Sequence, residues 1–151
     1  MRCSDKIDHL VDALITAQAA MPSVAKDGSN PHFNSKYASL PGIFTVCLPV
    51  LNENKLLLVQ CPGEAPNGYV ALETTLMHHS GQWLSSSLVM PTGKDTAQAV
   101  GSALTYARRY AFCAMLGIVA DDDDDGNAAT GAGDKGPKAG EAPKDDLDDL
   151  F

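Results

Sequence analysis

The sequence lacks the residue patterns from which most catalytic and metal sites are built. Its four cysteines form no C-x-x-C pair, and no histidine set accompanies them. Gly93-Lys94 has neither the upstream glycine nor the following Ser or Thr of a phosphate-binding P-loop. Ser85-Ser86-Ser87 has no nucleophile elbow and no His/Asp framework. We therefore expect no catalytic residues, no metal ligands and no cofactor.

Long apolar runs are missing as well. No stretch approaches the ~18 residues that a membrane span requires, and the N-terminus has no apolar signal-peptide segment. Most of the cysteines (Cys3, Cys47, Cys61 and Cys113) lie in apolar surroundings, which favours buried, reduced thiols. These features predict a cytoplasmic protein that does not enter a membrane.

The chain has no excess of positive charge, and its formal net charge of -8 argues at first against a nucleic-acid partner. The negative charge is not evenly distributed. Of the 19 acidic residues, 11 follow Ala120 together with only 3 of the 11 basic residues, which leaves residues 1–120 neutral. This asymmetry is typical of an acidic interaction tail attached to a separate folded domain. We place the domain at residues 1–126 and expect a disordered acidic tail at residues 127–151, because that segment has too few apolar residues to offset its ordering entropy.

Periodicity predicts two helices in the first third of the chain. Apolar residues at helical spacing follow Ser4, a plausible N-cap, and Pro22 should end this first helix. A second helical stretch runs from about Ser39 to Asn52, in which Pro49 produces a kink or marks the end.

The middle of the chain predicts strands. Short apolar or alternating runs joined by turn residues cover Leu56 to Cys61, Tyr69 to His78 and Trp83 to Met90. Three consecutive strands with short connections favour a three-stranded antiparallel β-meander, and a long helix from Gln98 is the obvious cover for one face. The expected fold class is therefore α+β, with the meander packed on the long C-terminal helix and N-terminal helices completing the core.

The Gln98 helix carries an apolar stripe about 120° wide at ~100° per residue. We place in it Val100, Leu104, Ala107, Ala111, Ala114, Met115 and Ile118. Arg109 is expected to project from the opposite side, and Arg108 to lie at the edge of the stripe.

Tyrosines flank this arginine pair, and two interpretations are open. Arg108 and Arg109 offer hydrogen-bond donors to phosphate, while Tyr106 and Tyr110 offer faces on which any base can stack. The alternative is a solvated helix face with an arginine paired to a carboxylate. Lys36, beside Tyr37, forms a second cation–aromatic cluster in a loop; its alternative is an ordinary turn anchored by aromatic side chains.

Two acidic segments end the chain. The run Asp121 to Asp125 lacks the alternating ligands of a calcium loop, so a solvated charge run is favoured over a metal site. The last residues, Asp148, Asp149, Leu150 and Phe151, place apolar anchors among carboxylates, which suits a basic-rimmed hydrophobic pocket on a partner. The alternative is a tail that only adds solubility.

Several strings resemble the ERF (essential recombination function) family of phage single-strand annealing proteins. The strings are NPHFNSKYASL (30–40), PVLNEN (49–54), QAVGSALTYARRYA (98–111) and LGIVADDDDDGN (116–127). The resemblance covers about residues 5 to 127. The C-terminus is similar to the acidic tip of bacterial single-stranded DNA-binding proteins, although Leu150 stands where those proteins have proline.

The resemblance implies an ATP-independent recombinase that binds single-stranded DNA cooperatively, as a homo-oligomeric ring or helical filament, and pairs complementary strands in phage recombination. It would act in the cytoplasm of a bacterial host. We expect Arg108, Arg109, Tyr106, Lys36 and Tyr37 to contact the DNA. Asp148, Asp149, Leu150 and Phe151 would contact a host replication or repair protein. The main alternative is an adaptor or DNA mimic whose acidic tail recruits host repair proteins, and a nuclease that uses the aspartate run is a third class.

Overall fold

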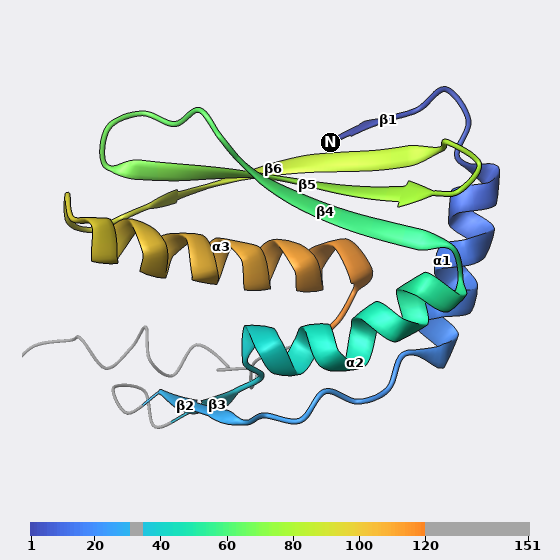
Figure 1. The fold of residues 1–151 in the computed structure, drawn as a ribbon, viewed down its shortest axis with the longest axis horizontal. Helices are drawn as coiled ribbons and strands as arrows, with labels where there is room; N and C mark the ends of the chain where they lie inside the picture. Colours follow the sequence, from blue (N-terminus) through green and yellow to red (C-terminus); the bar gives the residue numbers. More distant parts are fainter. Residues whose placement is uncertain (31–34, 120–151) are drawn as a thin grey trace, which may run out of the picture.

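The computed structural model describes residues 1–30 and 35–119 (Figure 1). Within these residues, three helices accompany two antiparallel sheets, which confirms the α+β class. In order, the elements are β1 (Arg2–Cys3), α1 (Asp8–Ala20), β2 (Gly28–Asn30), β3 (Ser35–Tyr37), α2 (Leu40–Glu53), β4 (Leu56–Gly63), β5 (Tyr69–His78), β6 (Trp83–Pro91) and α3 (Ala97–Leu116).

The larger sheet has four strands in the order β1-β6-β5-β4, one more than expected. The additional strand, β1, has only two residues, and the guanidinium of Arg2 forms an ion pair with Glu73 on β5. β5 spans the predicted residues, while β4 and β6 run slightly further than predicted. The turn residues of Asp27 to Pro31 and the polar run Asn34 to Lys36 predict turn and loop structure, but residues 28–30 and 35–37 form a second, two-stranded sheet of β2 and β3.

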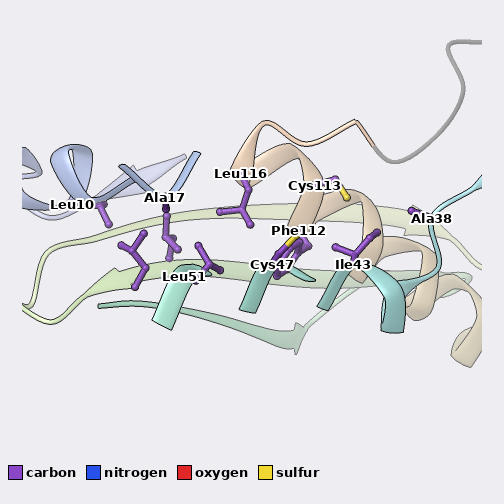
Figure 2. Close-up of a cluster of buried hydrophobic side chains, with 11 residues drawn as sticks. Leu10, Ala17, Ala38, Ile43, Cys47, Leu51, Phe112, Cys113 and Leu116 are labelled. Carbon is purple, nitrogen blue, oxygen red and sulfur yellow. The ribbon is translucent and has the colours of Figure 1, made fainter. Parts of the chain in front are cut away.

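The helices pack on one face of the large sheet. Figure 1 shows α3 running along this sheet, with α2 and the β2–β3 pair further from it and α1 at one end. Figure 2 shows the main core between these elements, where Phe112 of α3 meets Cys47 and Ile43 of α2, and Leu116 lies towards α1. All four of these side chains are buried because the helices pack against each other as well as against the sheet.

The prediction that Ser4 caps the first helix is wrong. The N-cap of α1 is Ile7, without a side-chain hydrogen bond. The hydroxyl of Ser4 instead donates to the carbonyl of Lys6 (2.6 Å) and accepts from the backbone N–H of Trp83 (3.0 Å). Gln82, in the β5–β6 turn, holds the start of α1 in place instead. Its side chain accepts a hydrogen bond from the N–H of Leu10 (2.9 Å) and donates one to Asp8 (2.7 Å).

The start of α2 is fixed by two side chains. Ser39 is the N-cap, and its hydroxyl accepts from the N–H of Gly42 (3.2 Å). Asp27 accepts from both the N–H and the hydroxyl of Ser39, each at 2.7 Å. These bonds, first the one from the Ser39 side chain, lower the pKa of Asp27 below its ordinary value. Pro49 lies within α2, which continues to Glu53.

The predicted apolar stripe of α3 needs correction. Ala107 is buried as expected, but Ala114 is exposed and Arg109, predicted to project away from the core, is only 5% exposed. The other buried residues of α3 are Ala103, Phe112, Cys113 and Leu116. The prediction assumed that only the sheet covers α3, whereas α2 also packs against it and the chain around Tyr37 and Ala38 covers Arg109.

The cysteines are only partly as expected. All four are free, and Cys47 and Cys113 are buried, but Cys3 and Cys61 are exposed because they lie on the outermost strands, β1 and β4. Burial raises the pKa of the Cys47 thiol. Within residues 1–30 and 35–119, no helix has the length and apolar character that crossing a membrane requires.

Candidate nucleic-acid interface

The guanidinium of Arg109 lies inside a group of three tyrosines. Its central carbon is 4.4 Å from the ring centroid of Tyr37, 5.0 Å from that of Tyr110 and 5.2 Å from that of Tyr106. It also donates to the carbonyl of Ala38 (3.5 Å) and to the Tyr110 hydroxyl (3.4 Å). We call Arg109 with Tyr37, Tyr106 and Tyr110 the tyrosine cage. Each of these cation–π contacts is worth about 0.5–2 kcal/mol, and the one with Tyr37 joins α3 to β3.

A glycine on the neighbouring strand makes room for the cage. Gly28 of β2 pairs with Tyr37 of β3, and a Cβ atom placed on Gly28 would lie 2.5 Å from two ring atoms of Tyr37. Tyr37 therefore lies directly over the Gly28 backbone, and the guanidinium of Arg109 also lies over its ring. A side chain at residue 28 would force the Tyr37 ring to shift, although nothing in the local sequence identifies the pair.

The outer side of the cage is open to solvent. Tyr106 and Tyr110 are each 42% exposed, and their rings stack at 6.1 Å with an interplanar angle of 23°. Two hollows meet at Tyr106. One, of about 180 Å³, lies between the cage and the start of α2; the other, of about 390 Å³, lies along the β6–α3 connection, with Lys94 in its wall.

Arg108 points in another direction from its neighbour. It is exposed, and its guanidinium carbon lies 5.5 Å from the ring centroid of Phe44 on α2. Gln60 of β4 donates to the backbone carbonyl of Arg108 (2.9 Å), which ties this turn of α3 to the sheet. Consecutive helical residues are about 100° apart at 3.6 residues per turn, so the two arginines face different neighbours.

Of the five residues expected at the interface, the structure brings together Tyr37, Tyr106 and Arg109. Lys36 is exposed next to Tyr37 on β3, where successive side chains point to opposite faces. Sequence reasoning missed Gly28, Phe44 and Lys94 as parts of this surface. Only Lys94 had a usable signal, a cation in the loop just before the helix that carries the arginines.

No group of three or more His, Cys, Asp or Glu in the part of the chain that the structure describes is placed to hold a metal ion. Asp121 to Asp125, the domain boundary at 126/127 and the terminal Asp148, Asp149, Leu150 and Phe151 lie outside the described residues.

The fold and this surface define an α+β domain with exposed tyrosines and basic side chains around one helix. The sequence model of the ERF superfamily matches residues 10–148, which is most of the chain. The chain therefore belongs to the ERF superfamily. This membership indicates a phage protein that functions in single-strand annealing. Comparisons with curated proteins and with solved structures found no match.

Proposed function

We propose that this protein binds single-stranded DNA cooperatively and pairs complementary strands without ATP or another cofactor, in phage recombination in the cytoplasm of a bacterial host. The observation that supports this most directly is the exposed Tyr106–Tyr110 stack beside the buried Arg109, with Lys94 in the adjoining hollow. Exposed aromatic faces beside cations bind single strands without reading their sequence.

The five expected DNA-binding residues take different parts in this proposal. Arg108 and Lys36 are exposed and neutralise phosphates, and Lys94 joins them. Tyr106 supplies a face for a base. Arg109 and Tyr37 brace that face, because Arg109 is only 5% exposed and has little surface left for phosphate. Contacts to phosphate without base readout leave the base edges available for pairing, which annealing requires.

The proposal includes assembly into a homo-oligomeric ring or helical filament, which the charge of the domain supports. Residues 1–120 carry eight acidic and eight basic residues, so one copy has no general positive field. Several copies that place their Arg108, Lys36 and Lys94 side chains along one strand create a local positive track and make binding cooperative. The acidic end, with Asp148, Asp149, Leu150 and Phe151, binds a host replication or repair protein in this proposal.

The test compares the full chain with a chain that ends at Gly126, in binding and annealing of complementary oligonucleotides. We expect both to bind and anneal without ATP, and only the full chain to retain a host replication or repair protein. Absence of binding and annealing in both chains would refute the proposal. Retention of the host protein by the full chain alone would then favour the adaptor or DNA mimic.

The nuclease alternative has a separate readout in the same assay. Cleavage of the oligonucleotide that needs Mg²⁺ and is lost on Asp123→Ala would establish it. We expect no cleavage, because adjacent aspartates repel one another and the sequence positions no general base beside them.

A further inference from the structure

A hollow lies between the tyrosine cage and the start of α2. It is lined by Tyr37, Leu40, Pro41, Tyr106 and Arg109, together with the two hydroxyl residues Ser39 and Thr105. Its volume of about 180 Å³ is below the range of roughly 300–1,000 Å³ that is typical for drug-sized ligands. The site therefore fits one small, flat group with an apolar face.

The charges around the hollow decide between a phosphate and a base. A helix N-terminus ordinarily attracts an anion, but Asp27 already occupies that position at α2. Its carboxylate accepts two hydrogen bonds from Ser39 and lies 3.0 Å from where a Cβ of Gly42 would be. A second anion would be repelled there, and the side chains of Leu40 and Pro41 offer it no donors.

Two lysines near the hollow can neutralise the phosphates of a nucleotide whose base enters it. Lys36 is exposed and directly precedes Tyr37, and Lys94 lines the hollow on the other side of Tyr106. Cations beside an aromatic-walled site are complementary to a base flanked by phosphates.

From these observations we propose that each copy takes one unstacked nucleobase of the bound strand into this hollow, against Tyr106 and beside the caged Arg109. The inference rests on the proposed binding of single-stranded DNA and adds how each copy of the protein holds the strand. The base held there is withdrawn from pairing until it leaves the site, whereas its neighbours stay accessible.

The test combines a change in the protein with a change in the DNA. Thr105→Trp fills the hollow from the exposed side of α3, and Thr45→Trp is its matched control. Both threonines are exposed on helices and donate to the carbonyl four residues earlier (Gly101 at 2.9 Å and Pro41 at 2.8 Å), but Thr45 does not line the hollow. Each full-length variant is titrated with oligo(dT) and with an oligonucleotide of the same length made of abasic nucleotides.

We expect the unaltered protein to prefer oligo(dT) by roughly 5- to 150-fold for each stacked base. Thr105→Trp should remove most of this preference without changing the affinity for the abasic strand, and Thr45→Trp should change neither. Equal affinity of the unaltered protein for both strands would overturn the base site and leave binding through phosphates intact. An equal loss on both strands in Thr105→Trp would assign the hollow to the sugar–phosphate backbone and would also overturn it.

Crosslinking of the unaltered protein gives a second readout that does not depend on folding of a variant. Irradiation with oligonucleotides that carry 5-iodouracil should attach Tyr106 or Tyr37 to the base, as found by peptide mass analysis. Binding with crosslinks only at other residues would contradict the base site. Absence of any binding to single strands would refute the proposed function itself.

Discussion

Arg108 and Arg109 are adjacent and chemically identical, yet they lie in two different regions of the molecule. Arg109 is inside the tyrosine cage, where it holds β3 against α3, and it is 5% exposed. Arg108 is exposed on the side of α3 that faces α2, over the ring of Phe44. The comparison teaches that two adjacent residues of one helix can differ completely in burial. In the proposed interface, Arg109 organises the surface and Arg108 offers charge to the DNA.

The largest expected effect is on stability, at Arg109. Arg109→Met keeps an apolar stem but removes the cation from three aromatic rings, so we expect the free energy of unfolding to fall by roughly 2–4 kcal/mol. Arg108→Met is the matched control and should change it by less than about 0.5 kcal/mol, as is usual for an exposed side chain. Urea denaturation measures both values. Equal losses would remove the distinction between the two regions.

A second variant breaks the cage from its other side. In Gly28→Ala the new Cβ atom meets the Tyr37 ring, and we expect a loss of about 1–3 kcal/mol from overpacking. Gly101→Ala is the control: it lies in α3 with nothing within 4 Å of the added atom, and it should gain about 0.5–1 kcal/mol. Thermal unfolding of the two variants should therefore shift in opposite directions. Tolerance of Gly28→Ala would mean that Tyr37 is not fixed over residue 28.

The smallest expected effect is the pH dependence at Asp27. Its folded-state pKa is lowered, first by the hydrogen bond from the Ser39 side chain. The stabilisation is therefore complete above the unfolded value near 3.8 and is lost as the pH falls through the lower folded value. Asp27→Asn should be less stable than the unaltered protein at pH 6, and this difference should shrink towards pH 2. A constant difference across this range would contradict the assignment.

Much of the fold could be predicted from local patterns. The alternating run Tyr69 to His78 forms β5, and the helical stretch predicted from about Ser39 to Asn52 forms α2 at Leu40–Glu53. β1 and the β2–β3 pair could not be predicted, because each strand has only two or three residues, too few for a periodic pattern. β1 in addition pairs with β6, which is distant in sequence.

The candidate site was predictable in its residue types but not in its arrangement. The Tyr-Arg-Arg-Tyr string identified α3, whereas a helical wheel placed Arg109 on the solvent side. A helical wheel considers one covered face, whereas Arg109 is buried in part by Ala38, 71 positions away in the chain, and its neighbour Tyr37. The difference in burial between Arg108 and Arg109 thus follows from tertiary contacts, which a local sequence pattern cannot predict.

The central proposal is that Arg108 contacts phosphate whereas Arg109 organises the surface. The most direct test is the salt dependence of the affinity for single-stranded DNA, measured for Arg108→Met and Arg109→Met at a temperature where both variants are folded. Each phosphate contact on a single strand contributes about 0.7 to the slope of log affinity against log salt concentration. We predict a slope reduced by about 0.7 in Arg108→Met and an unchanged slope in Arg109→Met, whatever the loss of affinity. The reverse result, with the slope reduced only in Arg109→Met, would contradict the account.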